Sequence, residues 1–323
     1  MTVIILINWN GADDTLACLR SLAVAEGDFR VVVGDNGSTD GSLERIQAFL
    51  GSGEWLGMAR HEAEVIPLGR NWGFAAGNNK VVGYARRYQP DSYMLLNNDT
   101  EVEPDFMARL QAYRQAHPDV KVVGPLVCYW AEKGRIWSCG GELTFGTRKG
   151  YFKESLTEDM SERSPLPVTF ISGCALLADA SLVDPDGKLL TERFFFGEED
   201  YEFAHRMRRA GERMAIVREA VVYHKVGRSM VQDTPEKTSS RKLGRDYMYY
   251  LGRFIVARLY YSPMQFRLIL LLSLPRCYKY FKADGLSSSE ALRLTRRLRH
   301  DAHVKEGITY EDFKSLTEKP QID

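Results

Sequence analysis

The sequence predicts an α/β fold, with a Rossmann-like, mostly parallel sheet flanked by helices and followed by a helical C-terminal extension. Short aliphatic runs alternate with helix-like segments from residue 2 to residue 124, which is the pattern of parallel strands joined by helices. These runs are apolar along most of their length, as expected of strands that are buried on both faces. After residue 240 the sequence becomes aromatic and arginine-rich, which predicts the extension.

The elements of the first half can be placed in order from these patterns. We expect strands at residues 2–8, 29–33, 65–68, 93–96 and 120–124. Leucine and isoleucine at helical spacing predict helices around residues 16–22 and 43–50, and two more helices are expected up to Tyr88 and up to His117, the second opened by Pro104. Because parallel strands end at the same edge of a sheet, the loops that follow them should open on that edge.

The second half is less regular. Residues 151–165 are polar and are expected to form a loop, and residues 168–177 are strand-like. We expect a helix from Glu198 to Ala210 that Gly211 ends, and then two strands at 214–217 and 220–223. In the extension we expect helices separated by Pro263 and Pro275, and a capping box at residues 287–290. We divide the chain into domains at 1–240 and 241–323.

Composition restricts the classes of function. The 43 basic residues offset the 43 acidic ones, so the overall charge indicates no nucleic-acid partner. The five cysteines include no C-x-x-C pair, which argues against a disulfide framework or a zinc site and for a reducing compartment. The N-terminus lacks a basic leader, and the apolar run at 268–274 is too short to span a bilayer. We therefore expect a cytoplasmic protein. A peripheral contact of the C-terminal helices with the inner face of the cell membrane is left open. The oligomeric state is also left open.

Three polar, glycine-rich loops follow the expected strands. Residues 8–11 read Asn-Trp-Asn-Gly, residues 35–42 combine two carboxylates with an amide and hydroxyls, and residues 70–79 offer a cation and amides at the start of a helix. A nucleobase and a ribose need such donors and acceptors, and a phosphate suits a helix start. Each loop alone is also explained as a turn with a helix cap or as a glycine-rich connection. Three such loops on one edge predict a binding site.

The strand at 93–96 ends in Asn97-Asn98-Asp99-Thr100. A carboxylate at the end of a buried strand suits a hard divalent cation that already carries substrate phosphates, because Mg²⁺ uses few protein ligands. A strand-end turn in which Asn98 and Asp99 cap the next helix is the favoured interpretation of this motif alone. The loops on the same edge reverse that preference.

Glu198, Glu199 and Asp200 open a helix directly after three phenylalanines. Acids at a helix N-terminus are stabilised by the helix dipole, so simple capping is a serious alternative. An acid held against an apolar wall has a raised pKa, which suits a general base. His224 follows the last expected strand. It is a candidate metal contact only if the fold brings it near Asp99.

These motifs together resemble a known family. The segments at 7–11, 35–40, 71–79, 96–100, 197–200 and 223–224 occur in the order found in inverting family 2 glycosyltransferases of the type A fold. The chain is most similar to the bacterial rhamnosyltransferase branch of that family. The resemblance covers about residues 2–260, and six ordered motifs are far more specific than any one of them.

The resemblance implies a role for each motif. Asp35 and Asn36 would contact the nucleobase, while Asp99 would bind Mg²⁺ or Mn²⁺ on the diphosphate, with His224 at the same end. Asp200 would deprotonate the acceptor hydroxyl, with Glu199 beside it. The candidate nucleotide- and substrate-binding residues are Asn8, Asn10, Asp35, Asn36, Arg70, Asn71, Gly73, Asn78, Asn97, Asn98 and Gly173. The metal motif departs from the family pattern because it begins with Asn97 rather than Asp, and the assignment of Asp200 over Glu199 rests on register.

The implied reaction is direct displacement at the anomeric carbon of a nucleotide sugar, with inversion. We expect dTDP-L-rhamnose as the donor ahead of a UDP-sugar, and a glycan or a lipid-linked saccharide as the acceptor, in cell-surface polysaccharide synthesis. A UDP-hexose-dependent glycosyltransferase is the first alternative. A nucleotidyltransferase is the second alternative, and it needs a basic, glycine-rich loop directly after the first strand. Residues 8–13 contain no Lys or Arg, so this alternative ranks well below the glycosyltransferase. A non-catalytic sugar-binding protein is the third alternative, against which the intact Asp99 and Asp200 argue.

Overall fold

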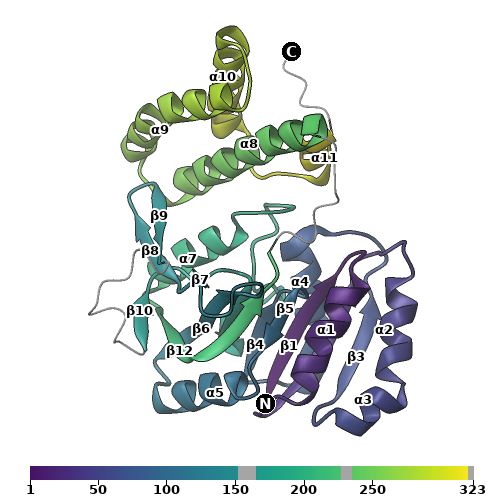
Figure 1. Ribbon diagram of the computed structural model, residues 1–323. Helices are drawn as coiled ribbons and strands as arrows, with labels where there is room; N and C mark the ends of the chain where they lie inside the picture. Colours follow the sequence, from purple (N-terminus) through teal and green to yellow (C-terminus); the bar gives the residue numbers. More distant parts are fainter. Residues whose placement is uncertain (152–164, 227–234, 319–323) are drawn as a thin grey trace.

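The computed structural model describes residues 1–151, 165–226 and 235–318. A large curled sheet occupies the centre, helices cover both of its faces, and a group of helices from the end of the chain lies beyond one edge (Figure 1). The strand order is β10-β12-β6-β11-β4-β1-β2-β3, with β5 on β12 and β7 on β6. Strands β1, β2, β3, β4, β6 and β12 share one direction, because β11 pairs antiparallel with both β4 and β6. The predicted fold class, a mostly parallel sheet with helices on both faces, is confirmed.

The first half follows the predicted alternation. Its elements are β1 (Thr2–Asn8), α1 (Ala12–Ala23), β2 (Phe29–Asp35), α2 (Ser42–Leu50), α3 (Gly53–Met58), β3 (Ala63–Pro67), α4 (Gly73–Ala85), β4 (Ser92–Leu96), β5 (Thr100–Val102), α5 (Phe106–Ala116) and β6 (Val120–Tyr129). Helix α3 and strand β5 were not predicted. Pro104 lies two residues before Phe106, the first residue of α5, and does not open the helix.

The apolar strands are buried on both faces, as their sequence indicates. In β1, Ile4 and Leu6 pack into the core on one face, while Val3 and Ile5 pack into the core on the other. Successive side chains of a strand point to opposite faces, so an unbroken aliphatic run fits only a central strand. This burial fixes the register of the strand and therefore the edge on which its last residue lies.

The second half departs from the prediction in two places. Its elements are β7 (Ile136–Ser138), β8 (Gly141–Thr144), β9 (Thr147–Gly150), β10 (Leu166–Val168), β11 (Ala175–Asp179), α7 (Glu199–Ala210) and β12 (Arg213–His224). The single strand expected at 168–177 is two strands, β10 and β11, because residues 169–174 turn between them. The two strands expected at 214–217 and 220–223 are one, β12, in which the register shifts between Val217 and Val221. The loop expected at 151–165 lies, for residues 152–164, outside the described residues.

The chain ends in helices α8 (Pro235–Tyr260), α9 (Pro263–Ala283), α10 (Ser288–Val304) and α11 (Tyr310–Glu318). Capping boxes open α9 at Ser262 and α10 at Ser287, the second as predicted. Pro275 was expected to separate two helices, but it lies inside α9. It sits on the exposed side of the helix, where the carbonyl that it leaves unbonded is open to water, so the interruption costs less than in a core. The proposed domain boundary at residue 240 stays a prediction.

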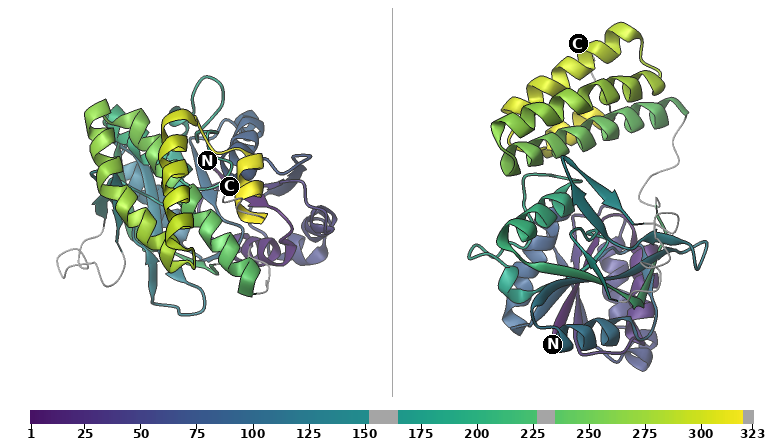
Figure 2. Two further views of the ribbon diagram at one scale, coloured as in Figure 1. Left: turned by 90° about the horizontal axis from the view of Figure 1, so that it is seen from above. Right: turned by 90° about the vertical axis from the view of Figure 1, so that its left-hand side faces the viewer.

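These helices share a hydrophobic core with the sheet domain. Phe170, Phe194 and Tyr201 pack in one cluster with Leu251 and Phe254 of α8. Figure 2 shows the helices lying side by side beyond the sheet, with the β8–β9 hairpin rising towards them. Among the described helices, none is long and apolar enough to cross a bilayer.

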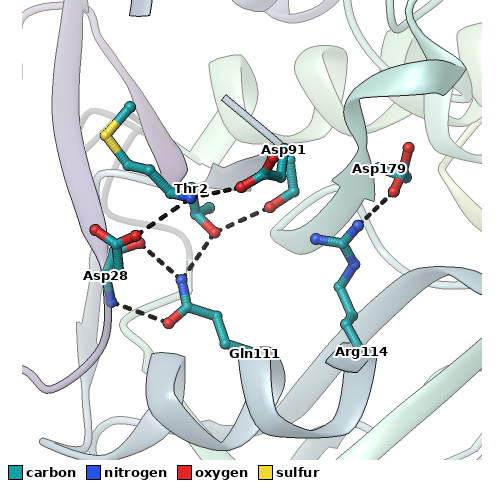
Figure 3. A network of polar contacts seen from close by, with 8 residues as sticks. Thr2, Asp28, Asp91, Gln111, Arg114 and Asp179 are labelled. Carbon is teal, nitrogen blue, oxygen red and sulfur yellow. Dashed lines mark hydrogen bonds and ion pairs between the residues drawn. The ribbon is translucent and has the colours of Figure 1, made fainter. Parts of the chain in front are cut away.

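A polar network closes the edge at which the parallel strands begin (Figure 3). The Met1 amino group lies 2.6 Å from Asp91 and 3.2 Å from Asp28, and Gln111 donates to Thr2 Oγ1 at 3.0 Å. A hollow of about 490 Å³ lies beside these residues. Its polar groups bond to one another, and it lies at the opposite edge from the loops that follow β1, β2 and β4. We therefore place the candidate site at those loops.

Candidate active site

The strand ends bring the predicted loops to one edge of the sheet. Strands β1 and β2 are paired in parallel, so Asn8 and Asp35 lie opposite each other at their last residues. Strand β4 runs parallel on the other side of β1 and leads into Asn97 and Asp99. Antiparallel pairing of β5 with β12 then sets His224 opposite Thr100. The site is therefore built by backbone pairing from strands far apart in the sequence.

The Asn8 and Asp35 side chains form a closed network at the floor of this edge. Asn8 Nδ2 donates to Asp35 Oδ2 at 2.8 Å, and the backbone N–H of Ser38 donates to Asp35 Oδ1 at 3.0 Å. Both side chains are buried. Asn10 adopts a positive φ of 51° and accepts from the Thr39 N–H at 2.8 Å. These bonds satisfy the buried polar atoms and hold the first two loops together.

A second network joins the loop after β2 to the start of α4. Asn36 Nδ2 donates to Asn71 Oδ1 and to the Gly73 carbonyl, both at 3.1 Å, and Asn36 Oδ1 accepts from the Trp72 N–H at 3.0 Å. Its whole amide is thus engaged by the chain. Arg70 stacks on the Trp72 ring, with its guanidinium carbon 3.8 Å from the ring centroid. The Asn36 amide is therefore bonded within the protein, while the Arg70 side chain is exposed.

Gly73 and Asn78 have positions that the structure explains without a ligand. Gly73 has a φ of +79°, and a Cβ there would lie 2.0 Å from the Phe195 carbonyl oxygen. Glycine is the residue that permits both the backbone conformation and this close approach. Asn78 Nδ2 donates to the Phe74 carbonyl at 2.9 Å, within its own helix. Gly73 therefore allows the start of α4 to pack against the segment that carries the acids, while Asn78 is bonded within α4.

Asp99 and His224 meet at the end of the β4 loop. His224 Nε2 lies 3.2 Å from Asp99 Oδ1, and both side chains are about nine-tenths buried. Within the described ranges, no group of three or more His, Cys, Asp or Glu side chains could hold a metal ion. A carboxylate and an imidazole whose Nδ1 has no hydrogen-bond partner still fit a divalent ion that takes most of its ligands from a diphosphate and water. The donor set therefore fits an ion shared with the substrate and not a metal held by the protein alone.

A chain of side-chain hydrogen bonds links the Asp99 loop to the network of Asn8 and Asp35. Asn98 Nδ2 donates to Thr15 Oγ1 at 2.9 Å, and the Thr15 hydroxyl donates to Asn8 Oδ1 at 2.8 Å. The Asn97 N–H donates to the Cys174 carbonyl at 2.8 Å. Asn97 and Asn98 thus position the loop, and Thr15 is a site residue that the sequence reasoning did not single out.

The acid triplet begins α7 and its three carboxyl groups have different surroundings. Glu198 adopts a left-handed backbone, with φ of 66°. Glu199 is buried, and burial followed by the neighbouring charge of Asp200 raises its pKa to about 8. Asp200 is less buried, and its Oδ2 accepts from the Gly173 N–H at 3.2 Å. At neutral pH Glu199 is therefore mostly protonated, and it cannot accept a proton in that form.

Two arginines complete this part of the site. Arg148 Nη1, on β9, lies 3.4 Å from Asp200 Oδ1 and 3.6 Å from Glu198 Oε2. Arg253 Nε, on α8, lies 3.3 Å from the same Glu198 oxygen. A row of alternating charges therefore runs from α8 to Asp200. No spacing or motif in the sequence pointed to either arginine, because the contacts depend on the β8–β9 hairpin and on the packing of α8.

The segment before α11 supports the loop that carries the acids. The Phe195 N–H donates to the Ile308 carbonyl at 2.8 Å, and the Ile308 N–H donates to the Arg193 carbonyl at 2.7 Å. Phe313 of α11 packs on Phe195, with ring centroids 5.3 Å apart. The C-terminal helices thus help to form the site as well as extending the chain beyond it.

The two groups of acids share the segment at residues 173–174. Gly173 donates to Asp200, while the carbonyl of Cys174 accepts from Asn97 in the Asp99 loop. Burial raises the pKa of the Cys174 thiol well above its usual value, and the charges of Asp99 and Asp200 both add to that shift. The two carboxylates therefore lie on either side of one short turn. Asp99 lies on the β4 side of this turn, and Asp200 lies on the α7 side.

The chain is similar to known proteins in family and in fold. Residues 3–180 match the family model described as glycosyl transferase family 2. No curated protein matches the sequence. Residues 1–349 of TarS from Staphylococcus aureus share the fold with a TM-score of 0.57 and 16% identity, over 99% of this chain and 91% of that one.

Two further solved structures show the same fold. The mannosyltransferase PcManGT from Pyrobaculum calidifontis, in complex with GDP-Man and Mn²⁺, has a TM-score of 0.57 and 15% identity, over 99% of this chain and 84% of that one. GalNAc-T7 with UDP, GalNAc and Mn²⁺ has a TM-score of 0.58 and 14% identity, over 99% of this chain and 56% of that one. At these identities the likeness shows the fold alone.

Proposed function

The chain belongs to glycosyl transferase family 2, and from this premise we propose that it transfers a sugar from a nucleoside-diphosphate donor to an acceptor hydroxyl, with inversion at the anomeric carbon. The observation that carries the proposal is the turn at residues 173–174, which has Asp200 bonded on one side and the Asp99 loop on the other. A direct displacement needs a base on the acceptor side and charge stabilisation on the leaving-group side. On one side of this turn Asp200 is the candidate for the base, and on the other side the Asp99 loop is the candidate for charge stabilisation.

Asp200 is the proposed base. Its Oδ2 is held by the Gly173 N–H and its Oδ1 faces Arg148, so the carboxylate is oriented before the acceptor arrives. Glu199 has a pKa raised to about 8 by burial and by Asp200, so the proposal assigns it a neutral supporting role. General base catalysis contributes about 10²–10⁴-fold to the rate. As Asp200 takes the proton, the acceptor oxygen bonds to the anomeric carbon and the nucleoside diphosphate leaves with the electrons of the broken bond.

Asp99 and His224 are the proposed contacts of a divalent ion at the diphosphate. A bound Mg²⁺ or Mn²⁺ would neutralise the charge that grows on the leaving diphosphate. The proposal draws support from the 3.2 Å approach of these two side chains and from their burial. Mn²⁺ in PcManGT and GalNAc-T7 also supports it, although those structures share only the fold.

The nucleobase is proposed to lie over the network of Asp35 and Asn36, with Asn8, Asn10 and Asn71 positioning its loops. Arg70 and the Gly73 backbone would face the nucleotide from the start of α4, which Asn78 stabilises. Asn97, Asn98 and Gly173 hold the Asp99 and Asp200 loops. The Asn36 amide already bonds to other residues of the chain. We therefore propose that Asn36 shapes the nucleobase pocket more than it contacts the nucleobase directly.

For the donor we propose dTDP-L-rhamnose ahead of a UDP-hexose, on the similarity of the motifs to rhamnosyltransferases. The base methyl distinguishes thymine from uracil by the burial of only one group, about 1 kcal/mol, so nucleobase discrimination should be modest. The proposed acceptor is a glycan or a lipid-linked saccharide of the cell surface. It would be reached in the cytoplasm or at the inner face of the membrane.

A panel of nucleoside diphosphates and nucleotide sugars tests the proposal by thermal shift, with and without Mg²⁺ or Mn²⁺. We expect a nucleoside diphosphate to raise Tm only when the divalent ion is present, because the ion joins the diphosphate to Asp99. Competition between donors then ranks the sugars. A UDP-hexose that is turned over much faster than dTDP-L-rhamnose would remove the rhamnose assignment and leave the glycosyltransferase proposal in place. No shift with any nucleotide would contradict the proposed function.

A further inference from the structure

Helix α9 exposes apolar side chains that the fold does not use. Met264 is 79% exposed, Leu271 is 70% exposed and Leu272 is 60% exposed, and their spacing puts them on one face. The opposite face already supplies Phe266, Ile269 and other buried residues to the core. A helix that needs only one apolar face to pack, but has two, presents the second to a partner.

The second half of the same exposed face is basic. Arg276, Lys279 and Lys282 continue the line of the leucines, and Arg267 stands beside them. Helix α9 contains no acidic residue. The neighbouring helix α10 adds exposed arginines at 293, 296 and 299. Because the whole chain has equal numbers of basic and acidic residues, this concentration of positive charge is a local feature of α9 and α10.

The buried face of α9, opposite its exposed leucines, contacts one hairpin that reaches the acid side of the candidate site. A Cβ on Gly146, at the turn between β8 and β9, would lie 2.9 Å from the Ile269 side chain, so this turn touches α9. Phe145 beside it is exposed and packs edge-on against Tyr261. Arg148 of the same hairpin reaches Asp200 at 3.4 Å. Figures 1 and 2 show these helices beyond the edge at which the strands β1 and β4 end.

We propose that α9, with the basic face of α10, docks the protein on the surface of an anionic phospholipid bilayer. Met264, Leu268, Leu271 and Leu272 enter the interfacial region, while the arginines and lysines lie at the lipid phosphates. Charge complementarity selects this occupant. In a contact between two copies of α9 the basic half would find no carboxylate on the partner helix, whereas a bilayer of anionic lipid supplies negative charge along its whole surface.

The docked orientation has a consequence for catalysis. It leaves the hairpin that bears Arg148 on the far side of α9 from the lipid, about one helix diameter from the lipid surface. An acceptor saccharide that extends from a membrane lipid past α9 is thereby presented near Asp200. The use of docking in catalysis rests on the proposed glycosyl transfer, whereas the binding to lipid does not.

Vesicle co-sedimentation of the full chain, without nucleotide, tests the proposal. We expect the protein to partition onto phosphatidylcholine vesicles that contain phosphatidylglycerol at least about tenfold more strongly than onto phosphatidylcholine alone. Added salt should reduce the difference, because it screens the lysines and arginines. The double variant Leu271→Ser, Leu272→Ser should lose about tenfold or more in partition coefficient. The double variant Arg276→Gln, Lys279→Gln should lose a similar factor on the anionic vesicles only.

Matched variants elsewhere on the surface control for the loss of exposed leucine or arginine. Leu56→Ser removes a leucine that is 71% exposed on α3, and Arg60→Gln with Arg87→Gln removes two exposed charges of the sheet domain. These variants should bind vesicles as the wild type does, and all variants should keep the wild-type Tm because the changed side chains are exposed. Binding that is equal for the α9 variants and the wild type, or no binding to anionic vesicles, overturns the proposal. A third result would also overturn the proposal: light scattering shows that the wild type is an oligomer, the leucine double variant is a monomer, and neither protein binds vesicles.

Activity is measured separately, as nucleoside diphosphate release in solution. Vesicle binding without release would leave docking in place and contradict the proposed function. Nucleoside diphosphate release without vesicle binding would support the proposed function and contradict docking.

Discussion

Nε2 of His224 lies 3.2 Å from Oδ1 of Asp99. The approach is fixed by the backbone, because β5 and β12 pair antiparallel next to these residues and the Lys225 N–H donates to the Asp99 carbonyl at 3.0 Å. The sequence made His224 a candidate metal contact only on the condition that the fold brought it to Asp99. The fold meets that condition, and the metal role itself stays a proposal.

Asp99→Ala should weaken nucleoside diphosphate binding in the presence of Mn²⁺ by about tenfold or more and abolish transfer, because it removes the carboxylate of the loop after β4. The fold should survive, with a lower Tm without ligand, because the variant leaves the buried His224 without its carboxylate neighbour. Titration calorimetry with and without EDTA measures the effect. Asp105→Ala is the control, since that carboxylate pairs with Arg109 on the surface. Turnover of Asp99→Ala near the wild-type value at saturating metal and donor would disprove the assignment.

Glu199→Gln should change how stability depends on pH. The pKa of Glu199 is raised from 4.5 to about 8 in the folded protein, so between these values the unfolded chain releases a proton that the folded chain keeps. Stability from the protonated carboxyl is complete below about pH 4.5 and is lost as the pH rises to about 8. The variant should therefore lose less free energy of unfolding than the wild type over that interval, by a few kcal/mol at most.

Urea unfolding at a series of pH values measures this difference. Glu44→Gln, on the exposed side of α2, is the control and should follow the wild type. Parallel curves for Glu199→Gln and the wild type would show that Glu199 is not held protonated.

Arg148→Gln should lower kcat about tenfold with a smaller change in the KM of the donor, because Asp200 loses the cation that orients it and Glu198 loses one of two arginine neighbours. Arg148→Lys should restore part of the loss, since it keeps the charge without the planar group. Arg135→Gln, which removes an exposed ion pair with Glu132, should be neutral. An unchanged kcat in Arg148→Gln would remove Arg148 from the site.

Gly73→Ala should destabilise the protein by more than about 1 kcal/mol and weaken nucleotide binding. The new Cβ would meet the Phe195 carbonyl oxygen at 2.0 Å in a backbone with φ of +79°, so α4 and the loop before the acids must separate. Gly83→Ala in the same helix is the control, because nothing lies within 4 Å of its Cβ position, and it should be neutral or stabilising by about 0.5–1 kcal/mol. Equal unfolding midpoints for the two variants would contradict this explanation.

The parts of the fold that could be predicted are those whose signal is local. The aliphatic runs of β1, β2 and β4 reveal buried strands, and the polar residues that end them, such as Asn8 and Asp35, follow directly. Strand β5 is three residues long and exists because β12 pairs with it, so no local pattern marks it. The bulge that joins the two halves of β12 is likewise set by its neighbour β6.

The candidate site divides in the same way. Asp99, Glu199, Asp200 and His224 could be selected as chemically suitable residues at element ends. Arg148 could not, because its contact with Asp200 depends on how a short hairpin packs between α7 and α9. Which acid is the base could also not be decided from spacing, because the pKa of Glu199 depends on burial that only the fold creates.

Asp200→Asn, compared with the wild type in a nucleoside diphosphate release assay, tests the central claim most directly. Nucleotide sugars are supplied with Mn²⁺, water or an added saccharide serves as acceptor, and chromatography identifies the nucleotide product. The account predicts that the wild type releases a nucleoside diphosphate, and that Asp200→Asn binds the donor as tightly but releases it about 10²–10⁴-fold more slowly. An unchanged rate in Asp200→Asn, or release of a nucleoside monophosphate in place of the diphosphate, would contradict it.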